Sequence, residues 1–149
     1  DRMVLAAGAT LMYPNQNRLI IDAGTCITYD FVNAENQYLG GAISPGIKIR
    51  YKSLNNYTSK LPLLTLSEDF EIIGNSTKSA IHSGVINGVI FEIEGFISQY
   101  SLKNQDLTII LTGGDAEFLA KRLKSTIFAN SNFLLESLNL LSLYTQKND

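Results

Sequence analysis

The stretch LIIDAGTCITY, residues 19–29, places two apolar and β-branched runs on either side of a short segment that contains glycine. This pattern predicts two strands, over 18–22 and 27–32, joined as an antiparallel hairpin. A second turn at 34–36 and a further apolar run over 38–43 add a third strand. The chain is therefore expected to build a three-stranded antiparallel meander, and the remaining residues must cover that sheet.

Much of the remaining chain predicts helices. An Ala- and Leu-rich helix is expected over 2–12, and a second over about 47–57, where the preceding Ser-Pro-Gly suits a helix start. The longest apolar periodicity predicts a helix over 77–100. Three glycines, Gly84, Gly88 and Gly95, interrupt it. Because glycine costs helix stability, we expect a close backbone contact there.

The last third of the chain adds a buried strand over 106–111 and a helix over 115–124. Residues 128–135 fit either a strand or a loop, and 138–144 predict a final helix. No repeat or linker divides the sequence. The 149 residues therefore predict one α/β domain, a mixed sheet with an antiparallel hairpin unit and flanking helices.

Composition narrows the class of function. Hydrophobic residues make up 45% and charged residues 17% of the chain, and the net charge is −2, which disfavours nucleic-acid binding. The lone cysteine, Cys26, cannot form an internal disulfide and is expected to be a small buried thiol. The lone histidine, His82, lies on the predicted long helix and is expected to have a packing or surface role.

The single cysteine favours a cytoplasmic protein. No apolar run is expected to reach membrane-spanning length, and no signal peptide is visible. Residue 1 is Asp rather than Met, so we expect a piece of a longer chain or a cleavage product.

Two motifs carry chemistry. Asp22-Ala23-Gly24-Thr25 follows a strand, where Gly24 allows close approach of a phosphate and Thr25 offers a hydroxyl. Asp22 cannot usefully touch phosphate, so its natural role is to hold a cation. Taken alone, the motif is more often a simple hairpin turn.

The second motif, Thr112-Gly113-Gly114-Asp115, lies between a strand and a helix. Gly113 and Gly114 would let adenine or ribose lie against backbone, although a plain strand-to-helix turn reads the same way. In this order, the two motifs resemble the second, ribonuclease H-like lobe of the acetate and sugar kinase/actin superfamily, in which the first motif holds phosphate and the second holds adenosine.

Further motifs sharpen the resemblance. They are, in order, Asp1-Arg2, DAGTCITYD, GGAISPGI, Leu61-Pro62, GNSTKSAIHSGV and LTGGDA. Together they resemble type III pantothenate kinase over nearly the whole chain. The resemblance implies ATP-dependent phosphorylation of the pantothenate hydroxyl, the first step of coenzyme A biosynthesis, with Mg²⁺, a monovalent cation (K⁺ or NH₄⁺) and a homodimer.

The resemblance also assigns residues. It implies that Asp1 is the general base, that Arg2 and Thr77 bind pantothenate, with Thr77 reaching across the dimer interface, and that Asp22 binds the monovalent cation. ATP contacts fall on Gly24, Thr25, Gly113 and Gly114. Asp1-Arg2 could equally be a solvated chain end, and Thr77 or a neighbour could simply cap a helix.

The family's first lobe, with its Asp-x-Gly-Asn-Thr phosphate loop, is absent from this sequence. The chain would then be a second lobe that holds half of a nucleotide site, with weak or no kinase activity alone. Two alternatives remain. One is another small-molecule kinase of the same superfamily, and the other is a non-enzymatic regulatory or dimerisation module related to pantothenate kinases.

Overall fold

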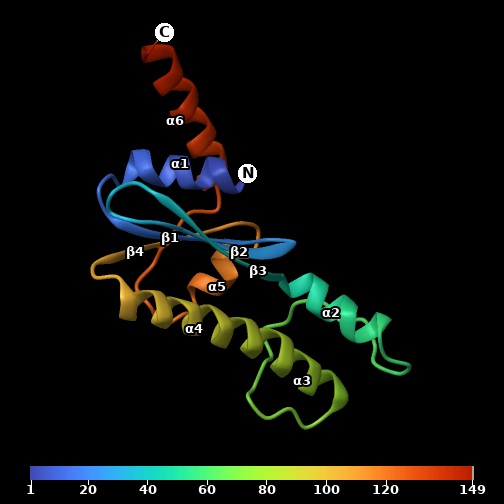
Figure 1. Ribbon diagram of the computed structural model, residues 1–149. Coiled ribbons are helices and arrows are strands. Elements are labelled where there is room, and N and C mark those ends of the chain that lie inside the picture. The colour runs from blue at the N-terminus through green and yellow to red at the C-terminus, as the bar shows by residue number, and fades with distance from the viewer. Residues whose placement is uncertain (149) are drawn as a thin grey trace.

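The computed structural model describes residues 1–148 and is built on one five-stranded sheet of order β3-β2-β1-β4-β5 (Figure 1). Strands β1, β2 and β3 form the expected antiparallel meander, and β4 and β5 extend it as parallel neighbours of β1. The strand bounds are Asn17–Ala23 (β1), Cys26–Val32 (β2), Tyr38–Pro45 (β3), Leu107–Thr112 (β4) and Phe128–Ala129 (β5).

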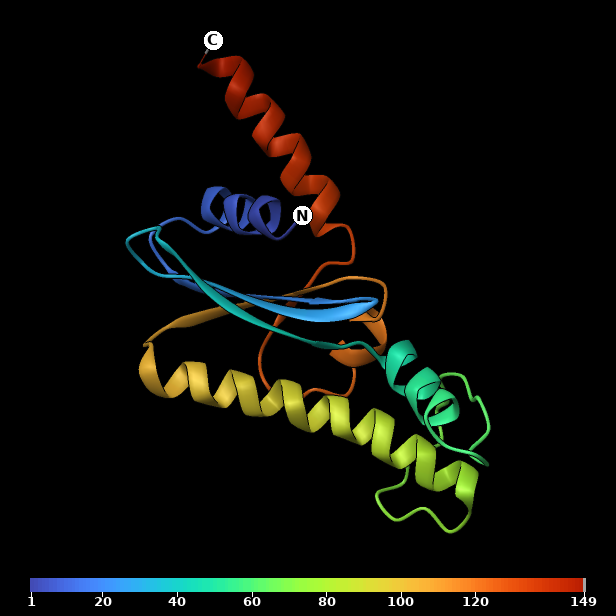
Figure 2. The same cartoon turned by 45° about the vertical axis from the view of Figure 1, so that its right-hand side comes forward.

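Helices cover both faces of this sheet (Figure 2). Helix α1 lies on one face with α6 packed against it, and the long α4 runs across the other face with α5 beside it, while α2 and α3 lie beyond one end of the sheet. Their bounds are Arg2–Met12 (α1), Ile47–Asn56 (α2), Thr77–His82 (α3), Gly88–Lys103 (α4), Ala116–Ala120 (α5) and Phe133–Lys147 (α6), and the π-helical turn η1, Ser83–Asn87, joins α3 to α4.

The alternation along β1 divides the apolar core in two. Leu19 and Ile21 pack in the larger cluster under α4, whereas Ile20 packs with Leu5 and Phe133 under α1 and α6. Successive strand residues point to opposite faces, so this pattern places even-numbered β1 residues on the α1 side. The same rule assigns Asp22 to the α1 face, which matters for the site.

Three boundaries differ from expectation. The helix expected over 115–124 ends at Ala120, and the ambiguous segment 128–135 contains both β5 and the start of α6. The final helix begins at Phe133 rather than 138, because Phe133 and Ser137 are buried against α1 and anchor its first turns. Local composition alone does not show that contact.

The long helix corrects two expectations. A Cβ at Gly84 or Gly95 would meet nothing within 4 Å, and one at Gly88 would meet only Arg50 Nη1 at 3.9 Å. Within the described residues, these glycines therefore make no close backbone contact. Thr77–Lys103 is also long and apolar enough, with mean hydropathy 1.3, to meet the length and composition criteria for a membrane span. Its buried row, including Val89 and Ile93, packs on the sheet as a core helix does.

Candidate functional site

Two loops meet at one edge of the sheet. Asp22 on β1 is the register partner of Thr112 on β4, so both parallel strands end side by side. The Asp115 N–H donates to the Ala23 carbonyl at 3.0 Å, which ties the β4–α5 turn to the hairpin tip. The structure thus brings together the two motifs that the sequence separates by almost ninety residues.

Gly113 makes this contact possible. Its φ is +100°, and a Cβ there would lie 2.5 Å from the Ala23 carbonyl oxygen and 2.6 Å from Asp22 Oδ1. Only glycine adopts that backbone conformation at no steric cost and leaves the Asp22 carboxylate room. Gly114, by contrast, faces open space.

A third loop completes the edge. The Gly46 N–H, at the start of α2, donates to the Thr25 carbonyl at 3.0 Å. A pocket of about 550 Å³ opens beside these loops. Its lining combines the loop residues with apolar and basic side chains, namely Gly24, Thr25, Ile47, Lys48, Tyr51, Lys52, Leu63, Leu64, Thr65, Leu66, Gly114 and Asp115. Ligands of α/β sheets commonly bind at such an edge, beyond the carboxyl ends of the strands.

Asp22 is half-buried on the α1 side of this edge. Burial, and secondarily the nearby Asp30 carboxylate, raise the pKa of Asp22 above its ordinary value. Thr28 lies opposite Asp22 on β2, and its buried hydroxyl bonds to no other residue among 1–148. A carboxylate that needs compensation beside an unpaired hydroxyl fits a hard cation held by oxygen ligands. No cluster of three or more His, Cys, Asp or Glu side chains occurs in the described part of the chain.

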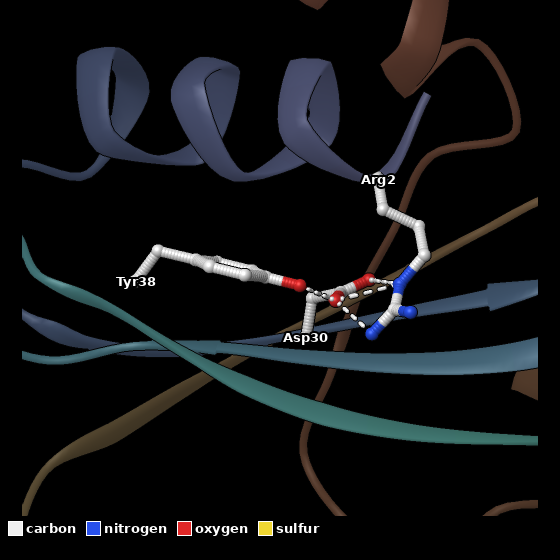
Figure 3. Close-up of polar contacts among 3 residues, drawn as sticks. All are labelled: Arg2, Asp30 and Tyr38. Atoms are coloured by element: carbon white, nitrogen blue, oxygen red, sulfur yellow. Dashed lines mark hydrogen bonds and ion pairs between the residues drawn. The ribbon is translucent and has the colours of Figure 1, made fainter.

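Arg2 forms an ion pair with Asp30 at the start of α1 (Figure 3). Its Nε and Nη2 both donate to Asp30 Oδ1, at 2.9 and 2.7 Å, and the Tyr38 hydroxyl donates to the same oxygen at 2.5 Å. Asp30 lies two residues from Thr28 on β2, so Arg2 reaches the same face of the sheet as Asp22. Asp1 is exposed just ahead of this helix.

Thr77 lies apart from these residues. It is the first residue of α3, and its side chain is exposed. Helix α3 lies at the end of α4 that is farther from β4 (Figure 1). The neighbouring Ser76 caps the helix, accepting from the Ser79 N–H at 3.1 Å. The structure therefore brings Asp22, Gly24, Thr25, Gly113 and Gly114 to one edge, but it does not bring Thr77 to Arg2 within one chain.

Cys26 is exposed, which corrects the expectation of a buried thiol. It is the first residue of β2, at the hairpin tip, and burial along the strand begins only at the next residue, Ile27. His82 packs as expected, with Nδ1 2.7 Å from the Tyr51 hydroxyl.

The sequence did not predict two polar clusters. One is Asp30 with Arg2 and Tyr38; the other is Glu92 on α4 with Arg50. A signal for the first was present, since an aspartate inside the apolar run TYDFV must find a partner when its strand is buried. Nothing local shows which arginine that partner is.

This arrangement of sheet and loops defines a lobe of the actin-like ATPase and sugar-kinase fold. Among solved structures, a Baf family transcriptional activator from Campylobacter jejuni superposes with a TM-score of 0.67 at 22% identity, covering 95% of this chain and 65% of that one. An activator of 2-hydroxyisocaproyl-CoA dehydratase from Clostridium difficile, solved with ADPNP, gives 0.50 at 12% identity, covering 98% and 68%. At these identities the similarity concerns the fold alone.

Sequence comparison gives the family. The family model for type III pantothenate kinase matches residues 1–99. Relatives named type III pantothenate kinase are 65% identical over 149 residues in Flavobacterium johnsoniae and 66% identical over 144 residues in Flavobacterium psychrophilum. The chain belongs to the type III pantothenate kinase family. The first alignment includes 100% of this chain and the second 97%. The chain nevertheless spans only 61% and 60% of the length of those two relatives.

Proposed function

We propose that this chain is the second lobe of a kinase that transfers the ATP γ-phosphate to pantothenate, giving 4'-phosphopantothenate in the first step of coenzyme A biosynthesis. The observation that carries the proposal is the junction of Asp22, Gly113 and the Asp115 N–H at the strand ends. Family membership supplies the substrates. A cytoplasmic location belongs to the same proposal.

ATP binds, in this proposal, along the edge formed by the two loops. Gly24 and Gly114 present backbone without side chains, and Thr25 adds a hydroxyl beside the same pocket. Gly113 keeps the two loops in contact. These features suit a nucleotide phosphate chain and a flat adenosine group, with Mg²⁺ carried by the nucleotide rather than held by a ready-made acidic cluster.

Asp22 holds a monovalent cation, K⁺ or NH₄⁺, with Thr28 as a neighbouring oxygen. Such a cation supplies positive charge that offsets the charge of the phosphate chain. The support is local, because the Asp22 carboxylate is half-buried, lies near another carboxylate, Asp30, and forms no ion pair with a basic side chain of residues 1–148.

Asp1 and Arg2 act on pantothenate. A carboxylate at Asp1 accepts the proton of the primary hydroxyl as it attacks phosphorus, and Arg2 holds the polar substrate. The support is that both lie at the start of α1, on the sheet face that also carries Asp22. Water exclusion and closure belong to the whole protein, of which this chain is one lobe.

Thr77 enters the site from a second copy of the chain. Within one chain, helix α3, which begins at Thr77, lies on the opposite side of the sheet from helix α1, which begins at Arg2 (Figure 1). The outer side of the long helix offers a surface for that copy, with Phe91 60% exposed beside Gly95 and a hollow lined by both. A Cβ at Gly84 or Gly95 would meet no other described residue within 4 Å, which leaves room for a neighbouring helix.

The test uses a fusion protein that joins the part of the F. johnsoniae relative not covered by this chain to the segment 1–149. The fusion is expected to phosphorylate pantothenate with ATP and to lose activity without K⁺ or NH₄⁺, whereas the isolated chain shows weak or no turnover. Pantothenate binding is measured by calorimetry. Binding of a different small hydroxyl compound in its place would favour another kinase of the superfamily.

The dimer has a separate test. In a monomer, Gly95→Ala should stabilise an exposed helix position by about 1 kcal/mol. If the helix packs on a second copy, the added methyl weakens association, and sedimentation shows more monomer. A wild-type chain that sediments as a monomer at all concentrations would count against an interface built from this lobe.

A further inference from the structure

Asp30 is the enclosed partner of Arg2. Its side chain has no exposed surface and lies between the sheet and α1 (Figure 3). Three donors reach it: Arg2 Nε and Nη2 and the Tyr38 hydroxyl. Because a buried carboxylate is costly unless it is paired and hydrogen-bonded, these contacts hold Arg2 where it is.

Arg2 gives Asp30 only one edge of its guanidinium. Nη1 donates to no residue in the described range, and 35% of the Arg2 side chain is exposed. The guanidinium is planar and rigid, so bonds at Nε and Nη2 also fix the direction of Nη1. The free edge is therefore presented to solvent in a single orientation at the start of α1.

We propose that Asp30 is a positioning residue that orients Arg2 for pantothenate, and that Tyr38 in turn fixes Asp30. This rests on the proposed function, in which Arg2 binds the substrate. Arg2 binds through its free edge and keeps Asp30 throughout, since leaving Asp30 would strand a buried carboxylate. The long side chain is thus ordered before the substrate arrives, which lowers the entropic cost of binding.

The fusion protein described above allows a kinetic test. Asp30→Asn keeps the shape but removes the charge that holds Arg2. It is expected to raise KM for pantothenate about tenfold or more, with a smaller change in kcat, since a charge-assisted bond has that weight. Tyr38→Phe removes one hydroxyl and is expected to raise KM about threefold. The effect is smaller because Asp30 loses only one neutral hydrogen-bond donor.

A double-mutant cycle separates positioning from general damage. In an Arg2→Ala background, Asp30→Asn should cause no further rise in KM, because its effect passes through Arg2. Glu94→Gln is the matched control. It neutralises a different, partly buried carboxylate, which Ser125 contacts on the opposite side of the sheet, and should lower stability without changing KM.

The outcomes are distinct. An unchanged KM in folded Asp30→Asn, or equal added effects with and without Arg2, would overturn the positioning role while leaving the proposed function intact. No pantothenate turnover in the wild-type fusion would overturn both. If Asp30→Asn does not fold, Tyr38→Phe decides, and an unchanged KM in that variant rejects the inference.

Discussion

The backbone N–H of Asp115 donates to the carbonyl of Ala23 at 3.0 Å, and this one bond joins the two loops that form the candidate nucleotide edge. It requires the β4–α5 turn to approach the hairpin tip so closely that Gly113 has no room for a side chain. The geometry of the edge therefore depends on one glycine as much as on the polar residues around it.

Gly113→Ala should destabilise the chain by about 2 kcal/mol or more. The added Cβ meets the Ala23 carbonyl and Asp22 Oδ1, and the positive φ disfavours alanine independently. Urea denaturation measures the loss. Gly114→Ala is the matched control at the next position, where a Cβ meets nothing within 4 Å, so its change should stay within about 0.5 kcal/mol. Equal effects of the two substitutions would contradict this account.

Asp22→Asn should stabilise the isolated chain at neutral pH, by an amount on the order of 1 kcal/mol. Burial, and then Asp30, raise the pKa of Asp22, so folding penalises its charged form relative to the unfolded chain. The stability that Asp22 contributes through this raised pKa is fully present below the unfolded pKa and is lost as pH rises through the folded pKa. Asparagine removes the charge, so the gain over wild type should shrink as the solution is acidified.

Thermal unfolding across pH, in buffer without K⁺ or NH₄⁺, measures this gain. Asp69→Asn, at an exposed carboxylate, is the control and should leave the curve unchanged. Added K⁺ should stabilise wild type more than Asp22→Asn if Asp22 binds the cation. A neutral-pH loss of stability in cation-free Asp22→Asn would show that its carboxylate already has a favourable partner.

Glu92→Gln should destabilise the chain by about 2 kcal/mol. Glu92 accepts from Tyr29 and Ser44 at 2.6 and 2.7 Å and pairs with Arg50 at 2.6 Å, which joins α4 to the meander and to α2. Burial tends to raise the pKa of Glu92, but these hydrogen bonds outweigh it, and the net pKa is lowered.

A lowered carboxyl pKa stabilises the fold above the unfolded pKa, and that stability is lost as pH falls through the folded pKa. The free energy of unfolding should therefore fall less on acidification in Glu92→Gln than in wild type, as measured by denaturation at several pH values. Glu71→Gln, at an exposed position, serves as control. A variant that unfolds at the same urea concentration as wild type at pH 7 would refute the role of this cluster.

The meander and the long helix could be predicted because their signals are local. The apolar and β-branched runs around Ala23-Gly24 and the apolar period after Thr77 each lie within one segment. The exposure of Cys26 and the start of α6 at Phe133 depend instead on which element covers which, and the Arg2–Asp30 pair joins residues 28 positions apart. Such contacts are set by packing, which a single sequence does not show.

Ser76 and Thr77 provide the last prediction, because the sequence left open which of them is structural. Ser76 forms a reciprocal capping box with Ser79, while the Thr77 side chain is exposed and makes no hydrogen bond within residues 1–148. Ser76→Ala should cost about 1 kcal/mol in urea denaturation, and Thr77→Ala should cost less than about 0.5 kcal/mol. In the active fusion the order should reverse, with Thr77→Ala raising KM for pantothenate and Ser76→Ala leaving it nearly unchanged. A Thr77→Ala variant with wild-type KM would remove Thr77 from the substrate site.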